Sequence, residues 1–241
     1  MTLFDVIDRT WPAQAFHPCG PFTLREGAGG GKRVSAASCT RPVTGSEIGD
    51  AESAMATLGQ PPLFQVQGDQ PGLDDQLAAR GYEVVDPVVI LLGDIDAVAG
   101  DGPPRVRAFP VWPILAIQSE IWDDGGIGPA RRAVMERARA PKTTILGRID
   151  DSPAGCAFVA LHDGVAMTHA VHVLPRFRRK GCAENMMRGA AVWARAQGAK
   201  HFAALTLSEN LPARTLYSSL GMQPVGHYHY RLKSPDRDPR D

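Results

Sequence analysis

The sequence predicts a mixed α/β fold, and three observations support this prediction. The 241 residues are 44% hydrophobic and 22% charged, an ordinary globular composition that can bury a sizeable core. Residues 143–149 and 155–161 alternate as paired strands do, and Asp150-Asp151-Ser152-Pro153 joins them. Helical segments that stop at a glycine follow several of the predicted strands.

The first hundred residues are predicted to contain short strands and two helices. The glycine-rich run 27–31 separates strands over 22–24 and 33–37. It lacks the Lys-Ser/Thr ending of a P-loop, so a hairpin turn is the preferred interpretation. Further along we expect a helix over 46–58 with Ser46 as its N-cap, a strand over 63–66, a helix over 73–80 ended by Gly81, and strands over 82–85 and 88–92. Residues 93–104, rich in Gly, Asp, Ala and Pro, are predicted to be a linker.

The second half carries a longer series of elements. We expect helices over 111–123 and 128–139, strands over 143–149, 155–161 and 165–174, a helix over 184–197, a strand over 201–207, a helix over 212–220 and a strand over 227–232. Residues 63–82 and 202–222 share one order of strand, turn, helix and glycine. This suggests two related units, although such an order also arises by chance. The predicted domains are residues 1–95, residues 104–233 and a polar tail over 234–241.

Composition argues against several classes of protein. The formal net charge is zero, so no nucleic-acid partner is expected. The four cysteines show no C-x-x-C spacing, so no metal is expected. The N-terminus lacks the basic region of a secretory signal, and the longest apolar run, 88–92, is too short to span a bilayer. We therefore expect a cytoplasmic protein with no membrane partner.

Residues 173–183 are the most informative stretch of the chain. An apolar strand leads through Pro175 into a basic turn, a glycine and a helix. Gly181 lets a ligand approach the backbone closely, and the N–H groups at the start of the helix favour an anion. The turn adds the positive charges of Arg178, Arg179 and Lys180. This arrangement predicts a site for a diphosphate.

Two motifs together resemble the GNAT (N-acetyltransferase) superfamily. Val173-x-Pro175-x-x-Arg178-x-x-Gly181-x-Ala183 is similar to the family's acetyl-CoA signature. The second motif of the family is matched by Asn210-x-x-Ala213-x-x-Leu216-Tyr217-x-x-Leu220-Gly221-Met222, in which Met222 replaces the usual Phe. The resemblance covers residues 140–241 well and 105–139 loosely. The first 95 residues resemble the degenerate half of tandem members.

The resemblance implies the GNAT fold and acetyl-CoA as co-substrate. In that fold a mostly antiparallel central sheet is splayed, here between residues 165–174 and 201–207, and a smaller degenerate GNAT-like unit would precede it. The strand edge near residues 171–173 would pair with the amides of the pantetheine arm, and the helix start would receive the diphosphate. The implied cofactor-binding residues are Val171, His172, Val173, Arg178, Arg179, Lys180, Gly181, Cys182, Ala183, Glu184 and Asn210.

The resemblance also implies the catalytic residues. Tyr217 would protonate the departing CoA thiolate, since an ordinary tyrosine with a pKa near 10 is protonated at neutral pH. The alternative is a core tyrosine packed at helical spacing. Many family members carry a Glu as general base where this chain has Met167. His169 lies two residues further on the same strand face and is our candidate base; a histidine held only by packing is the equal alternative.

The acceptor site is the least determined part of the prediction. Glu120 and Trp122 lie in the first helical region of the second half, which lines the acceptor cleft in the family. We predict that both contact the substrate, and Glu120 is a second candidate for the base. The alternative for Glu120 is an acidic side chain that faces water.

The predicted function is that of an acetyl-CoA-dependent N-acetyltransferase. It would move the acetyl group to a primary amine of a small molecule or peptide by direct attack in a ternary complex. One alternative is a non-catalytic CoA-binding regulatory module, motivated by the missing Glu and the degenerate first half. Another is an acyltransferase that uses a longer acyl-CoA. Self-association into a homodimer is left open.

Overall fold

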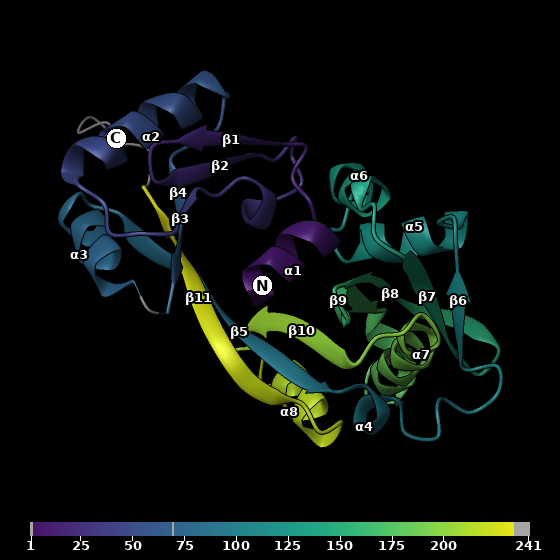
Figure 1. Ribbon diagram of the computed structural model, residues 1–241. Coiled ribbons are helices and arrows are strands. Elements are labelled where there is room, and N and C mark those ends of the chain that lie inside the picture. The colour runs from purple at the N-terminus through teal and green to yellow at the C-terminus, as the bar shows by residue number, and fades with distance from the viewer. Residues whose placement is uncertain (1, 69, 234–241) are drawn as a thin grey trace. The chain divides into compact units, whose positions relative to one another are not determined.

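A computed structural model describes residues 2–68 and 70–233, so the predicted tail over 234–241 lies outside the described residues. Contacts divide the chain into two compact units (Figure 1). Unit 1 comprises Met1–Pro12, Ile90–Thr206 and Asn210–Val225, and unit 2 comprises Ala13–Val89, Leu207–Glu209 and Gly226–Asp241. The first twelve residues therefore belong with the second half of the chain. A GNAT-like origin for the first half stays a prediction.

The sheet of unit 1 is mostly antiparallel. Its strands, in order, are β10 (His201–Leu207), β9 (Val165–Val173), β8 (Ser152–His162), β7 (Lys142–Ile149) and β6 (Ala108–Val111). Neighbours from β6 to β9 pair antiparallel, and β10 runs parallel to β9. The mixed α/β fold and the strand pair 143–149 with 155–161 are thus confirmed. Strands β5 (Glu83–Asp94) and β11 (Gln223–Leu232) each have residues in both units.

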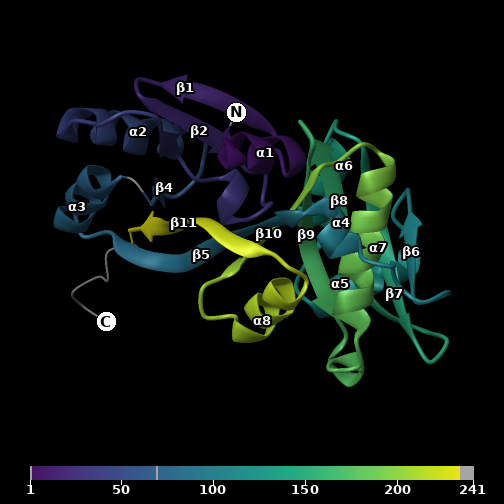
Figure 2. The ribbon, with the colours of Figure 1, turned by 60° about the horizontal axis from the view of Figure 1, so that its bottom comes forward.

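Helices cover both faces of this sheet. Helix α7 (Cys182–Ala196) packs against β6 to β9, and α4 (Ile95–Ala99) packs against α7 (Figure 2). Helices α1 (Leu3–Thr10) and α5 (Ala116–Asp124) pack against β8 and β9. A Cβ added at Gly155 of β8 would meet Met186 of α7, whereas Sγ of the next residue, Cys156, lies 4.0 Å from a carbonyl oxygen of α5. Because successive strand residues face opposite sides, α5 and α7 lie on opposite faces.

Shorter elements complete unit 1. They are α6 (Pro129–Arg137), the 3-10 turn η2 (Pro175–Phe177) and α8 (Leu211–Ser219). Across the part of the chain that the structure describes, no helix is long and apolar enough to cross a membrane.

Unit 2 contains a three-stranded sheet and part of the longer sheet that includes β4. Strands β1 (Ala15–Cys19), β2 (Phe22–Glu26) and β3 (Ser38–Cys39) form an antiparallel sheet, and β4 (Leu63–Gln67) pairs antiparallel with residues 228–232 of β11. Helices α2 (Gly45–Thr57) and α3 (Pro71–Ala79) and the 3-10 turn η1 (Lys32–Val34) complete it. In the core, the ring of Phe64 meets those of Phe22 and Tyr82 edge-on, with ring centroids 5.5 Å apart in both pairs.

Several element predictions are corrected by the structure. Residues 33–37, expected as a strand, contain the end of η1 and a turn, and within this range only Ala37 forms a β-bridge, to Phe64. The two strands expected over 82–92 are the single strand β5, and the expected linker contains α4. Asp94 begins that helix because its Oδ1 accepts hydrogen bonds from the N–H groups of Asp96 and Ala97. The helix expected over 111–123 starts only at Ala116, after β6.

Candidate active site

The candidate site begins where β9 and β10 diverge. Residues 201–204 of β10 align with residues 165–168 of β9, and the register of pairs ends there. Strand β9 nevertheless continues to Val173, and β10 continues to Leu207. Within the described chain, the last five residues of β9 therefore have no β10 partner. An extended ligand with amide groups could pair with this edge.

A bulge interrupts β9 in the same segment. His169 is aligned with Phe158 and His172 with Cys156, so Ala170 and Val171 together oppose only Ala157. Ala170 has a φ of +51°, which is unusual for a residue with a Cβ. A bulge of this kind redirects the strand and frees a backbone group from the ladder, and bulges are over-represented next to active sites.

The basic turn after β9 leads into a helix end that no side chain caps. Arg179 and Gly181 have φ values of +62° and +77°, and α7 begins directly afterwards at Cys182. The N-cap residue Gly181 has no side chain that could accept a hydrogen bond from the helix, and a Cβ added there would meet no atom within 4 Å. Arg178 donates from Nε to the carbonyl of Val173 at 3.1 Å. The first N–H groups of α7 and the exposed basic side chains thus suit an anionic group.

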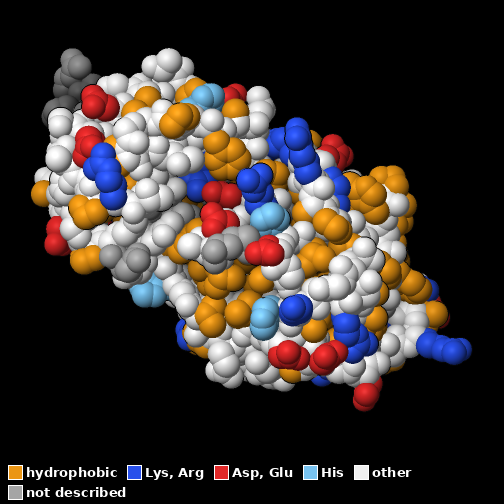
Figure 3. All heavy atoms as spheres, viewed as in Figure 1, with side chains coloured by type: hydrophobic (Ala, Val, Ile, Leu, Met, Phe, Trp, Pro, Cys, Tyr) orange, Lys and Arg blue, Asp and Glu red, His pale blue; other side chains and the backbone are white. Residues whose placement is uncertain are grey.

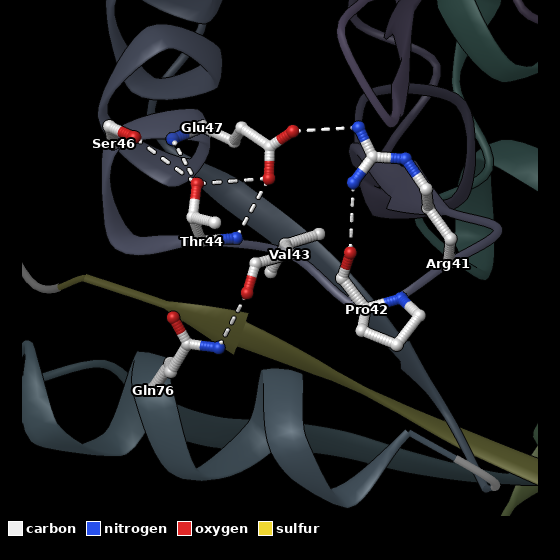
Figure 4. Close-up of polar contacts among 7 residues, drawn as sticks. All are labelled: Arg41, Pro42, Val43, Thr44, Ser46, Glu47 and Gln76. Atoms are coloured by element: carbon white, nitrogen blue, oxygen red, sulfur yellow. Dashed lines mark hydrogen bonds and ion pairs between the residues drawn. The ribbon is translucent and has the colours of Figure 1, made fainter.

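The N-terminus of α2 in unit 2 provides a contrast (Figure 4). Oγ1 of Thr44 accepts from the N–H of Glu47 at 3.4 Å, and the Glu47 carboxylate accepts from the N–H of Thr44 at 2.8 Å. Arg41 pairs with the same carboxylate at 2.7 Å, and this hydrogen bond is the main reason that the pKa of Glu47 falls to about 2. The cap is therefore Thr44 and not the predicted Ser46. The chain's own carboxylate occupies this helix end, whereas no side chain caps the N-terminus of α7.

The first turn of α7 contributes backbone groups more than side chains. Cys182 is buried, and its burial raises the pKa of its thiol to about 11. A neutral, buried thiol offers little to a ligand, so Cys182 and Ala183 can serve through their N–H groups. Glu184 forms an ion pair with Arg188 at 3.1 Å on the next turn.

On the face drawn in Figure 3, basic side chains lie among acidic and hydrophobic ones, and no single sign of charge dominates.

Tyr217 lies in α8, which Asn210 caps. Oδ1 of Asn210 accepts from the N–H of Ala213 at 3.2 Å, so this side chain caps the helix. The Tyr217 side chain is only 5% exposed. Burial raises the pKa of its phenol to about 12, so the hydroxyl keeps its proton through the neutral and moderately alkaline range. A phenol in this state can donate a proton but cannot accept one.

The raised pKa of Tyr217 predicts a loss of stability at high pH. An unfolded tyrosine ionises near pH 10, whereas the folded one ionises near pH 12, so ionisation between these values favours unfolding. We expect this group to remove about 2–3 kcal/mol from the free energy of unfolding as pH rises from 10 to 12. Urea unfolding of the wild type and Tyr217→Phe at pH 8 and pH 11.5 would measure it. Equal pH dependence in the two proteins would contradict the prediction.

His169 is held in the packing between α1 and β9. Its Nε2 lies 2.9 Å from Oγ1 of Thr10, whose hydroxyl donates to the carbonyl of Val6 at 2.7 Å. Because the Thr10 hydroxyl donates elsewhere, its oxygen is the acceptor of a hydrogen bond from the Nε2–H of His169. The Trp11 ring packs on the imidazole with centroids 5.0 Å apart, and His169 is 4% exposed. This geometry favours the packed histidine over the general base, and the catalytic role of His169 stays a prediction.

The two predicted acceptor residues lie in different surroundings on α5. Glu120 is exposed. Trp122 is fully buried, and its indole N–H donates to the carbonyl of Ala170 in the β9 bulge at 2.8 Å. The buried ring offers no exposed surface, and the predicted contact of Trp122 with the substrate stays a prediction. The partner of its indole N–H is the strand backbone.

Residues 111–222 match the family model described as "Acetyltransferase (GNAT) family". This segment is similar to the GNAT acetyltransferase family. The GNAT segment includes the β9 bulge, the basic turn, α7 and Tyr217. In the described residues, no group of three or more His, Cys, Asp and Glu side chains could hold a metal ion.

Whole-chain relatives extend the GNAT likeness beyond this segment. The chain is 28% identical over 236 residues to the uncharacterized N-acetyltransferase YobR of Bacillus subtilis (strain 168), covering 93% of this chain and 94% of that protein. A GCN5-related N-acetyltransferase from Kribbella flavida has the same fold, with a TM-score of 0.69, 18% identity, and coverage of 98% and 96%. A tandem GNAT protein from the clavulanic acid biosynthesis pathway matches with a TM-score of 0.58, 15% identity, and coverage of 89% and 78%.

Proposed function

We propose that this protein is an N-acetyltransferase that transfers an acetyl group from acetyl-CoA to a primary amine. The observation that carries the proposal is the path of β9. It leaves β10 after Thr168, passes through a bulge and enters a basic turn before an uncapped helix. This path offers, in sequence, an unpaired edge for an amide-bearing arm and N–H groups for a diphosphate.

Thioester activation, diphosphate binding and thiolate release each have a candidate group on this path or in α8. The N–H groups of residues 171–173 would polarise the thioester carbonyl as negative charge develops on its oxygen. The N–H groups of residues 179–184 would hold the diphosphate and fix the thioester relative to the amine. Tyr217 would donate its phenolic proton to the departing sulfur. Acetyl-CoA supplies the activated acetyl group, and the amine displaces the thiolate directly.

Deprotonation of the amine is the step with the fewest candidates. His169 is a poor one, because Thr10 engages its Nε2 and Trp11 covers its ring. Glu120 is exposed on α5 and is the second candidate for the general base predicted from the sequence. We therefore assign proton removal to Glu120 or to water. His169→Ala should then give a pH–rate profile of the same shape as that of the wild type.

The direct test is thiol release from acetyl-CoA by the purified full-length protein. The panel should contain amino acids, polyamines, aminoglycosides and peptides with free N-termini, and each amine should be run with acetyl-CoA and with a longer acyl-CoA. Amine-dependent release with acetyl-CoA supports the proposal. Release only with the longer acyl-CoA would make the protein a different acyltransferase. CoA binding without release from any amine would favour the regulatory module.

The contrast between α7 and α2 predicts one CoA per chain. Among the helices of residues 2–68 and 70–233, only α7 presents an uncapped N-terminus after a basic turn, whereas Thr44, Glu47 and Arg41 satisfy the N-terminus of α2. Isothermal titration of the full-length chain with CoA should therefore give a stoichiometry near one. A second CoA per chain would show that unit 2 also binds the cofactor.

A further inference from the structure

The end of α5 contacts the β9 bulge at three points. The indole N–H of Trp122 donates to the carbonyl of Ala170 at 2.8 Å. Oδ2 of Asp124 lies 3.1 Å from Nε2 of His172. The His172 ring lies so close to Gly125 that a Cβ added there would come within 2.5 Å of Nδ1. We call Trp122, Asp124 and Gly125 the α5 clamp.

The bulge needs such support because its backbone is unfavourable by itself. The φ of +51° at Ala170 is strained for a residue with a Cβ and costs about 1 kcal/mol or more. A strained conformation persists only where the surroundings fix it. Trp122 is fully buried, so its N–H would lose its partner if the bulge relaxed into regular strand. The contacts of His172 fix the backbone on the other side of the bulge.

We propose that the α5 clamp positions the N–H groups of residues 171–173 for the thioester carbonyl. Its members are positioning residues, because they act on the strand and need not touch the substrate. The inference rests on the proposed acetyl transfer. In this inference Trp122 and His172 both hold the β9 bulge in place. That role differs from the substrate contact predicted for Trp122 and from cofactor binding by the His172 side chain. It also explains why Gly125, beside the imidazole, has no Cβ.

The test compares clamp variants with a matched control on the same helix. Trp122→Phe keeps a buried ring and removes the donor, and Asp124→Ala removes the partner of His172. Asp124→Asn keeps an oxygen that can accept from Nε2, so it should recover most of the loss. Asp123→Ala is the control, because Asp123 pairs with Arg132 rather than with β9. Trp122→Phe and Asp124→Ala should lower kcat roughly tenfold and change CoA affinity less than twofold. The control should keep wild-type turnover.

A second measurement does not depend on turnover. Amide hydrogen exchange of residues 170–173 should speed up about tenfold in Trp122→Phe and Asp124→Ala and stay unchanged in Asp123→Ala. If the wild type is active and both clamp variants keep wild-type kcat and exchange, the clamp proposal is wrong. If exchange responds but the wild type acetylates no amine, the clamp stands as the support of the bulge and the proposed function fails. If Asp124→Asn instead loses activity and shifts the pH profile, His172 acts as a base and the positioning role is overturned.

Discussion

Replacing Tyr217 by phenylalanine should lower turnover by about two orders of magnitude while CoA affinity stays within about twofold. The substitution keeps the buried ring in α8 and removes only the hydroxyl, so the packing of the helix should survive. Without a proton donor, the thiolate must leave unprotonated or take its proton from water. That penalty applies in the transition state, so kcat falls while binding of the cofactor does not.

Tyr82 provides the matched control for this experiment. It is a buried tyrosine of unit 2 whose hydroxyl donates to Glu52 at 2.7 Å. Tyr82→Phe removes an equivalent hydroxyl far along the sequence from the motif and should keep wild-type turnover. Because the pKa of Tyr217 is raised to about 12, its ionisation should also cause no fall in activity up to about pH 10. Wild-type kcat in Tyr217→Phe would leave Tyr217 as a core residue only.

Gly181→Asp should weaken CoA binding tenfold or more, which corresponds to about 1.4 kcal/mol. A carboxylate at the N-cap would accept from the α7 N–H groups that the diphosphate needs, as the N-cap side chain of Thr44 accepts from the N–H of Glu47 at α2, and would repel the anion. The positive φ adds backbone strain, but no neighbouring atom lies within 4 Å of the added Cβ. The protein should therefore still fold.

Two further variants separate strain from ligand exclusion. Gly198, which follows α7 at its other end, has a φ of +88° and equally open space, so Gly198→Asp carries comparable strain away from the proposed site. It should keep wild-type CoA affinity by titration calorimetry. Gly181→Ala adds the backbone strain without the carboxylate, so its CoA affinity should lie between those of the wild type and Gly181→Asp. Unchanged CoA affinity in Gly181→Asp would move the diphosphate site elsewhere.

Local signals predicted much of the fold and the frame of the site. The strand over 201–207 and the helix over 212–220 were predicted from periodicity and helix-end signals, which act over a few residues. The turn before α7 was predicted from a proline, basic residues and a glycine within one short stretch. These features depend on neighbours in sequence, and sequence patterns describe such neighbours well.

Features that depend on distant partners could not be predicted in this way. Thr10 engages His169 across 159 positions, and Trp122 reaches the Ala170 carbonyl across 48. Nothing near His169 in the sequence indicates that Thr10 and Trp11 cover it. Helix α1 itself was missed, although Thr2 and Asp5 form a capping box at its start. The helix is short, and its role becomes visible only where it meets β8 and β9.

The division of the chain has a consequence for biosynthesis. Unit 1 takes residues from before and after the main segment of unit 2, and β4 of unit 2 pairs with residues 228–232 of β11. During translation, β4 must therefore wait until β11 has been synthesised before it can form this pair. Such long-range pairing makes folding slow and leaves a strand edge exposed meanwhile. A gene divided between the halves would encode two incomplete pieces, and we expect the nascent chain to depend on chaperones until β11 is made.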